Sequence, residues 1–144
     1  MIEAWAHFDR LRYDLVAAVV MPNHVHVMIR VREAFALSKI VQSWKSYTGR
    51  WIAEHFPEAV VRTEQGRRVW MRDYWDRYIR DEVHYAEAVA YISENPVRAG
   101  LVKRVDDWPW RVVGQAELEL GGMRLLASAL PGPLPAGRPG PAVR

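Results

Sequence analysis

The chain has 144 residues, half of them hydrophobic and 26% charged, which is the composition of one soluble globular domain. It contains no cysteine, which excludes disulfides, thiolate zinc sites and cysteine nucleophiles, so any metal must use histidine, carboxylate, amide or water ligands. The net charge is +3 and the pI is 9.4. Arginines greatly outnumber lysines. Phosphate binding would explain this excess, and so would a genome rich in G and C, which favours arginine codons.

No apolar run is long enough to cross a bilayer, and residues 1–5 lack the cationic and apolar segments of a signal peptide. We therefore expect a cytoplasmic protein. The charge alone gives about even odds that the protein binds nucleic acid.

The first part of the chain predicts a helix, two strands and a longer helix. Residues 3–12 carry aromatic side chains on one helical face. Residues 13–20 are apolar on both faces, which is the pattern of a central strand covered from two sides. Residues 37–54 gather apolar side chains on one stripe, which predicts an amphipathic helix that ends at Phe56 and Pro57.

Residues 24–32 predict a second strand whose two faces differ chemically, because side chains alternate along a strand. The apolar face carries Val25, Val27, Ile29 and Val31. The opposite face carries two histidines, a methionine and two arginines: His24, His26, Met28, Arg30 and Arg32. The first face is expected in the core, and the second is expected to form a partly polar floor.

His24 and His26 point the same way, with Cα atoms about 6.5 Å apart, so their imidazoles can converge on one divalent cation. Two half-buried histidines that only form hydrogen bonds would show the same spacing, and for an isolated pair this explanation is favoured by about two to one. The arginines on the same face, Arg30 and Arg32, argue for a polar site.

Residues 62–80 interleave arginines with tryptophans and tyrosines, the combination that holds the phosphates and bases of single-stranded nucleic acid. One or two short strands are expected there, around residues 68–71 and 76–79. A solvated face with core aromatics would have the same composition, and at least half of these aromatic residues are expected in the core.

Asp81 predicts the N-cap of a helix over residues 82–94. Pro96 is expected to end it, because the proline disfavours helical geometry at Asn95. Strands interleaved with helices predict an α+β fold, with a small antiparallel sheet and helices on one face.

Tyr91 lies on the polar side of this predicted helix, about 100° from its apolar neighbour Ile92. It shares that side with three polar residues at helical spacings, His84, Glu87 and Asn95. A lone tyrosine in such a place is usually a boundary residue. The amide oxygen of Asn95 is a candidate third metal ligand or a C-terminal helix cap, and both roles can hold together.

Three motifs follow one another along the chain: residues 20–26 (VMPNHVH), 75–82 (WDRYIRDE) and 91–102 (YISENPVRAGLV). Together they resemble the REP-associated tyrosine transposases, a domesticated branch of the single-tyrosine HUH transposases of bacterial insertion sequences. Residues 108–110 (WPW) also fit. The resemblance covers about residues 1–113, the expected catalytic domain. Residues 114–144 are expected to be a Pro- and Gly-rich extension that is disordered from about residue 130.

The resemblance implies a ferredoxin-like sheet with the strand of the two histidines at its centre. It implies that His24, His26 and Asn95 bind Mg²⁺ or Mn²⁺, and that Tyr91 is the nucleophile. The implied substrate is single-stranded DNA that bears a hairpin. The expected DNA contacts are basic residues: Arg30, Lys45, Arg68, Arg72, Arg77, Arg80 and Arg98.

Family members usually have a strand before the first helix, whereas this chain begins almost at that helix. We therefore expect the N-terminal strand to be missing and one edge of the sheet to be left unpaired.

The resemblance thus predicts a bacterial DNA transposase, associated with the nucleoid when bound to DNA, and either a monomer or a homodimer. The metal would orient the scissile phosphate. Tyr91 would attack it, giving a 5′-phosphotyrosine and a free 3′-OH that later rejoins strands. A free tyrosine hydroxyl keeps its proton at neutral pH, and His84 and Glu87 are the candidates by spacing to accept it.

Two alternatives from other classes remain at this point. The first is a catalytically idle single-strand DNA-binding protein or repressor derived from a transposase. The second is a metal-dependent hydrolase of small molecules, which would show no salt-sensitive binding to DNA.

Overall fold

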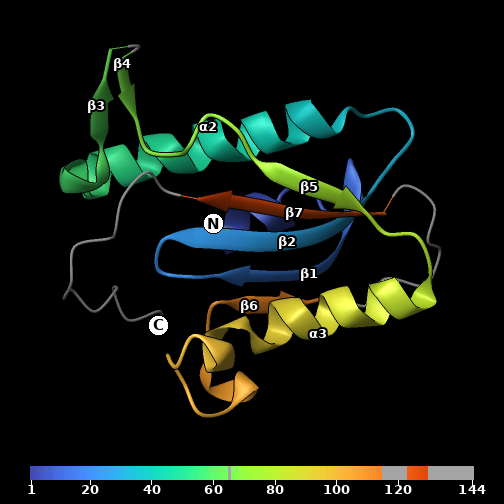
Figure 1. Cartoon of the computed structure of the whole chain (residues 1–144). Coiled ribbons are helices and arrows are strands. Elements are labelled where there is room, and N and C mark those ends of the chain that lie inside the picture. Colours follow the sequence, from blue (N-terminus) through green and yellow to red (C-terminus); the bar gives the residue numbers. More distant parts are fainter. Residues whose placement is uncertain (65, 115–122, 130–144) are drawn as a thin grey trace.

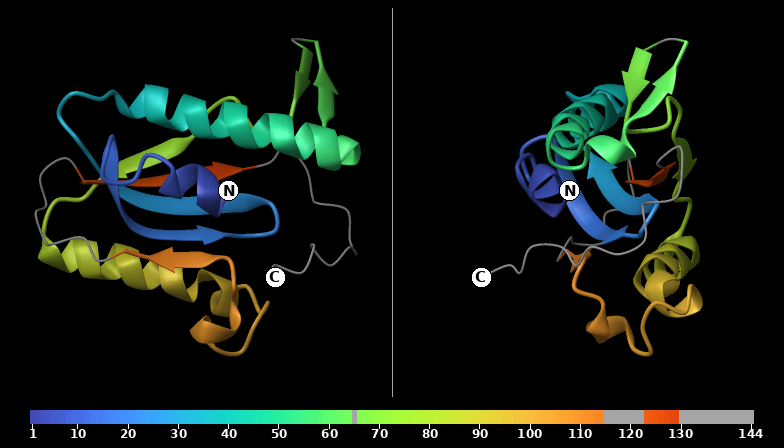
Figure 2. Two further views of the ribbon diagram at one scale, coloured as in Figure 1. Left: turned by 180° about the vertical axis from the view of Figure 1, so that it is seen from behind. Right: turned by 90° about the vertical axis from the view of Figure 1, so that its left-hand side faces the viewer.

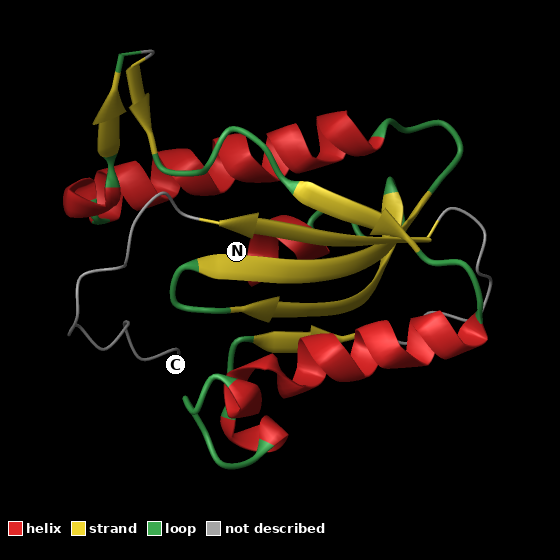
Figure 3. Ribbon diagram, viewed as in Figure 1, coloured by secondary structure: helices red, strands yellow, loops and turns green. Residues whose placement is uncertain are grey.

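The computed structural model describes residues 1–64, 66–114 and 123–129. In this part of the chain, three α-helices pack on a five-stranded antiparallel sheet of order β5-β7-β2-β1-β6, and β3 and β4 form a separate hairpin (Figure 1, Figure 3). The helices are α1 (Ile2–Ala6), α2 (Leu37–His55) and α3 (Glu82–Arg98), with short 3-10 turns η1 (Pro57–Ala59) and η2 (Val105–Asp107). The strands are β1 (Tyr13–Val20), β2 (His24–Val31), β3 (Val61–Thr63), β4 (Gly66–Arg68), β5 (Trp75–Tyr78), β6 (Arg111–Val113) and β7 (Met123–Ala129).

Helices cover both faces of the sheet, and the predicted α+β class with a small antiparallel sheet is confirmed. The side view in Figure 2 shows α1 and α2 on one side and α3 on the other. Val27 and Ile29 of β2 pack in the core under α2, whereas Met28 packs in the core under α3. The expectation that all helices lie on one face was wrong, because β1 and β2 present apolar side chains to both sides and each side needs a cover.

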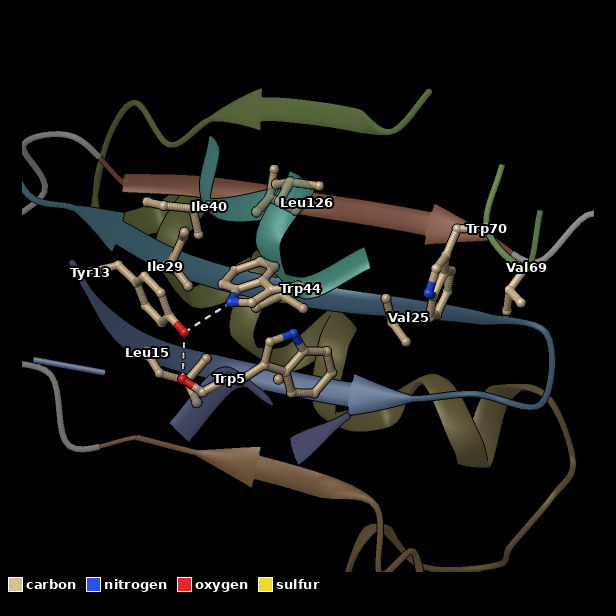
Figure 4. Packing of buried hydrophobic residues seen from close by; sticks show 13 residues of the cluster. Trp5, Tyr13, Leu15, Val25, Ile29, Ile40, Trp44, Val69, Trp70 and Leu126 are labelled. Atoms are coloured by element: carbon tan, nitrogen blue, oxygen red, sulfur yellow. Dashed lines mark hydrogen bonds between the residues drawn. The ribbon is translucent and has the colours of Figure 1, made fainter. Parts of the chain in front are cut away.

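The core under α2 is built around three aromatic residues (Figure 4). The Tyr13 hydroxyl donates a hydrogen bond of 2.5 Å to the carbonyl oxygen of Trp5 and accepts one of 3.0 Å from Nε1 of Trp44. All three rings are buried. Their polar atoms connect α1, β1 and α2, so the first helix is fixed to the sheet although it has only 5 residues.

Strand β2 lies at the centre of the sheet, as the resemblance implied. It pairs with β1 on one side and with β7 on the other, where His24 faces Ala129 and Arg30 faces Met123. No strand precedes α1 in the described residues, and β7, from the C-terminal part of the chain, pairs with the side of β2 that β1 leaves free. The sheet thus extends past residue 113, and the disorder expected from residue 130 lies outside the described residues.

The first helix is shorter than the sequence predicted. It ends at Ala6, whereas residues 3–12 were expected to be helical. Arg10 has a φ of 63°, which a right-handed helix cannot contain. The carboxylate of Asp9 stabilises this turn by accepting hydrogen bonds from the backbone N–H groups of Arg10 and Leu15.

Helix α3 begins as predicted and ends one turn later than predicted. The Asp81 carboxylate caps it by accepting from the backbone N–H of His84 at 2.8 Å. Pro96 does not end the helix but lies buried inside it, because a proline close to a helix end forfeits only one bond of the ladder. The helix ends at Arg98, and Gly100, two residues later, has a left-handed φ of 69°.

The later segments pack much as expected. β4 and β5 lie close to the two predicted short strands, each beginning earlier in the chain. Trp108 is buried, and its Nε1 donates a hydrogen bond of 3.0 Å to the carbonyl oxygen of Val20. In the described part of the chain, no helix combines the length and apolar character needed to cross a membrane.

Candidate functional site

The two histidines of β2 lie side by side on the face that α3 covers. Their ring centroids are 4.8 Å apart, and the ring planes are nearly perpendicular. His24 directly follows the turn from β1, in which the backbone N–H of Met21 donates to the carbonyl oxygen of His24 at 2.8 Å. Both residues therefore stand at the end of the two central strands, with His24 half-buried and His26 only 8% exposed.

Burial keeps both imidazoles neutral at neutral pH. Desolvation, with a smaller effect from neighbouring His24, lowers the pKa of His26 to about 4. Desolvation also lowers the pKa of His24. Nε2 of His26 is buried and finds no hydrogen-bond partner within the described residues. A buried neutral imidazole nitrogen without a partner has the chemistry of a metal ligand.

Tyr91 of α3 stands next to this pair. Its ring lies edge-on to that of His26, with 5.2 Å between the ring centroids. The neighbouring residue Ile92 is buried in the core, which fixes the rotation of α3 and leaves Tyr91 at the rim with 40% of its surface exposed. The structure thus brings His24, His26 and Tyr91 together from β2 and α3.

A cation also lies at the Tyr91 ring. The guanidinium carbon of Arg98 is 5.9 Å from the centroid of that ring. Arg98 forms an ion pair of 3.2 Å with Glu94, one turn earlier on α3. Both partners are largely exposed, so this pair holds the guanidinium only weakly.

Asn95 is also on this part of α3. Its amide nitrogen donates to the carbonyl oxygen of Tyr91 at 3.3 Å, which leaves the amide oxygen to accept another partner. Among the described residues, no group of three or more His, Cys, Asp or Glu side chains gathers as a metal site. A third protein ligand beside His24 and His26 would therefore come from another residue type, such as this amide.

His84, a candidate acceptor for the tyrosine proton, is occupied elsewhere. Its Nδ1 accepts from the backbone N–H of Arg80 at 3.4 Å, in the first turn of α3. Tyr91 is seven residues further along the helix, roughly 10 Å along its axis. The structure therefore gives His84 a role at the start of the helix.

Arg30 and Lys45, two of the seven expected DNA contacts, bind other segments of the fold. Arg30 binds the Asp14 carboxylate with contacts of 2.8 and 2.9 Å, and Arg32 binds the same carboxylate. Burial alone would raise the pKa of Asp14, but the hydrogen bonds from Arg32 and Arg30 outweigh it and lower that pKa. The Lys45 ammonium donates to three consecutive carbonyl oxygens, those of Met71, Arg72 and Asp73.

Two of the other basic candidates, Arg68 and Arg72, line a cleft of about 850 Å³ between α2 and residues 67–74, on the face of the sheet opposite to the histidines. Two further arginines of this cleft, Arg50 and Arg67, were not among the predicted contacts. Their charge pattern was visible in the sequence, but their convergence depends on how the β3-β4 hairpin folds against α2.

Strand β5, which precedes α3 in the chain, carries exposed aromatic residues. Trp75 is 52% exposed and Tyr78 49% exposed, and the guanidinium carbon of Arg77 is 5.6 Å from the centroid of the Trp75 ring. Trp70, by contrast, is buried, and its Nε1 donates to the Thr48 hydroxyl. The aromatic residues of this segment therefore divide between core and surface.

The described residues thus form a five-stranded α+β domain whose central strand carries two histidines beside a tyrosine of the covering helix. The family described as "Transposase IS200 like" matches residues 5–95. The chain belongs to this family.

Curated relatives agree with the family. A "REP-associated tyrosine transposase" of Escherichia coli (strain K12) is 30% identical over 100 residues, which cover 68% of this chain and 53% of the relative. A protein of Haemophilus influenzae named "Putative REP-associated tyrosine transposase" is 26% identical over 103 residues, or 68% of this chain and 57% of the relative. The chain thus spans about half the length of these relatives. No solved structure matches it significantly.

Proposed function

We propose that this protein is a metal-dependent DNA transposase, which nicks and rejoins single-stranded, hairpin-bearing DNA through a 5′-phosphotyrosine on Tyr91. The observation that carries the proposal is the contact between Tyr91 and His26, whose ring centroids are 5.2 Å apart. The contact lies within the residues that match the transposase family.

The residues at the site fit a divalent cation. His26 has a buried Nε2 without a partner within the described residues, and the low pKa of this imidazole keeps it neutral, as a ligand must be. His24, His26 and the amide oxygen of Asn95 would hold Mg²⁺ or Mn²⁺. When bound, such a cation supplies Lewis-acid polarisation of the scissile phosphate.

Tyr91 supplies the nucleophile. Its hydroxyl oxygen attacks phosphorus and loses its proton, the bond from phosphorus to the 3′-oxygen breaks, and that oxygen takes up a proton to become a free 3′-OH. In the second step a 3′-OH attacks the phosphotyrosine and restores the Tyr91 hydroxyl. No water is consumed, so the energy of the phosphodiester is retained for rejoining. Arg98, beside the Tyr91 ring, is placed to neutralise charge on the phosphate.

Binding of DNA would use the basic surfaces on both faces of the sheet. The arginines of the cleft offer phosphate contacts, and the exposed rings on β5 offer surfaces on which bases can stack. We propose Arg68, Arg72, Arg77, Arg80 and Arg98 as phosphate contacts. Arg30 and Lys45 would contribute by holding the fold beneath them, because their side chains bind Asp14 and the carbonyl oxygens of residues 71–73.

The test is formation of a covalent adduct. A hairpin oligonucleotide labelled at its 3′ end is mixed with the protein and Mn²⁺, since the 3′ fragment keeps the phosphate that joins tyrosine. Wild type should give a labelled band that survives denaturing electrophoresis. Tyr91→Phe should give none, whereas Tyr47→Phe, at an exposed tyrosine of α2, should react normally. An adduct with Tyr91→Phe would refute the assignment of the nucleophile.

The same assay separates the alternatives. Salt-sensitive binding of the hairpin without any adduct would identify an idle DNA-binding protein or repressor. Absence of binding at low salt would contradict both DNA functions and favour a small-molecule hydrolase. Loss of cleavage in His24→Ala, with binding of the hairpin retained, would support the metal site.

A further inference from the structure

The residue before the histidine pair makes a directed hydrogen bond to it. Oδ1 of Asn23 lies 2.7 Å from Nδ1 of His24. An amide oxygen can only accept a hydrogen bond, so the proton of this bond must be carried by Nδ1 of the imidazole. A neutral imidazole has one N–H, and Nε2 of His24 is therefore left with a free lone pair.

The backbone holds the two residues in this relation. Asn23 lies in the turn between β1 and β2. It follows Pro22, and the proline ring restricts the φ torsion of Pro22. The turn is closed by the hydrogen bond from Met21 N–H to the His24 carbonyl oxygen, and His24 is also paired with Ala129 of β7. The His24 backbone is thus held on both sides. The contact with Asn23 then determines the orientation of the His24 side chain.

The choice of tautomer matters for a metal ligand. The alternative tautomer would carry its proton on Nε2 and could not donate a lone pair from that atom. The second histidine also has an Nε2 that could bind a cation, since Nε2 of His26 has no hydrogen-bond partner within the described residues. Groups that orient a ligand histidine through its other ring nitrogen typically change metal affinity by about 10-fold to 100-fold.

We propose that Asn23 is a positioning residue, which holds His24 in the tautomer protonated at Nδ1 and so presents Nε2 to a divalent cation. This inference rests on the proposed metal site of His24 and His26. It assigns to Asn23 a role through His24 and no contact with the DNA.

The first measurement needs no metal and no catalysis. Protein labelled with ¹⁵N is prepared metal-free at pH 7.5, and two-bond ¹H–¹⁵N correlation spectra report which nitrogen of each histidine is protonated. Wild type should show His24 protonated at Nδ1. Asn23→Ala should lose this preference, while Asn23→Asp, which keeps an accepting oxygen, should retain it. His26 is the internal control, and its signals should be unchanged in both variants.

The second measurement is the affinity for Mn²⁺ alone, by titration calorimetry. Asn23→Ala should bind about 10-fold to 100-fold more weakly than wild type, and Asn23→Asp should bind at least as tightly. The proposal is overturned if wild-type His24 is protonated at Nε2, or if Asn23→Ala changes neither tautomer nor affinity. It is also overturned if the tautomer changes and the affinity does not.

Failure of the metal site itself would look different. In that case wild type would show the expected tautomer of His24 and no Mn²⁺ binding, and His24→Ala would match wild type in the titration. That result would leave the hydrogen bond from His24 to Asn23 in place and would remove its proposed role toward a cation.

Discussion

The ring of Tyr91 stands edge-on to that of His26 at an interplanar angle of 78°, although one residue belongs to α3 and the other to β2. His26 lies at the buried floor and Tyr91 at the accessible rim. The neutral, desolvated imidazole of His26 therefore lies next to a phenol, that of Tyr91, which is accessible from solvent. The consequences for activity and stability can be measured separately, because different residues carry them.

Arg98 provides a test of the charge beside Tyr91, the proposed nucleophile. Arg98→Ala should lower the single-turnover rate of adduct formation by roughly 10-fold to 100-fold, because in the proposed mechanism this cation lies next to the attacked phosphate. Its thermal unfolding midpoint should hardly change, since the Glu94 pair is exposed. Glu94→Gln is the matched control, as it breaks the same pair and keeps the cation. An equal loss of rate in Glu94→Gln would show that the ion pair matters and the free charge does not.

The cleft arginines and Lys45 should behave differently although all are cationic. Replacing Arg68 and Arg72 by alanine should weaken binding of single-stranded DNA and reduce the slope of log affinity against log salt by about 0.7 for each lost phosphate contact. Lys45→Met should instead lower the unfolding free energy, because three backbone carbonyl oxygens lose their donor. Fluorescence anisotropy over a range of salt concentrations, together with urea unfolding, distinguishes these effects. A full salt slope in the double variant would exclude the cleft as a DNA surface.

Tyr13 should make the fold sensitive to alkali. Burial, with the hydrogen bond from Trp44 opposing it, raises the pKa of Tyr13 to about 12. The unfolded chain releases this proton near pH 10, so the contribution to stability is complete below pH 10 and is lost as the pH rises from 10 to 12. The total loss is about 2–3 kcal/mol.

The control for this prediction is Tyr13→Phe. It should be less stable than wild type at pH 8 by about 1–3 kcal/mol, because Nε1 of Trp44 and the carbonyl oxygen of Trp5 lose their partner. Between pH 10 and 12 it should lose less stability than wild type in urea unfolding. Parallel curves for the two proteins over this range would contradict the prediction.

Strand β7 should contribute to the stability of the whole sheet. Leu126 and Met123 are buried, on opposite faces, so Leu126→Ala or Met123→Ala should each cost about 2–5 kcal/mol. Arg124→Ala removes a partly exposed ion pair with Asp76 and should cost less. Urea unfolding measures all three. Neutral effects of both core substitutions would mean that residues 123–129 do not complete the sheet in solution.

The hydrophobic periodicity and the capping residues of the sequence correctly predicted the two faces of β2 and the start of α3. The alternation along residues 24–32 separated the side chains of β2 that pack under α2 from the face of the two histidines, because this follows from the geometry of any strand. The Asp81 cap and the start of α3 were also predicted. The early end of α1 was not, since it depends on the left-handed backbone of Arg10 and the bonds that Asp9 makes around it.

Long-range contacts limited the prediction of the site. The proximity of Tyr91 to His26 was expected only from the family resemblance, because spacing along the chain cannot place α3 over β2. Lys45 was expected on DNA from its charge, whereas its donors bind carbonyl oxygens that only the folded loop brings near. Asn23 was part of a quoted motif, but its hydrogen bond to His24 becomes visible only when both side chains are placed.

The position of β7 has a consequence for protein synthesis. His24 pairs with Ala129, so the strand that carries both histidines has only one neighbour until the ribosome has released residues 123–129. Chains emerge from the N-terminus first, and contacts between distant residues form slowly. The nascent protein therefore passes through a stage in which Tyr91 has been translated but β2 beneath it still has an open strand edge, to which a chaperone or a second nascent chain could bind.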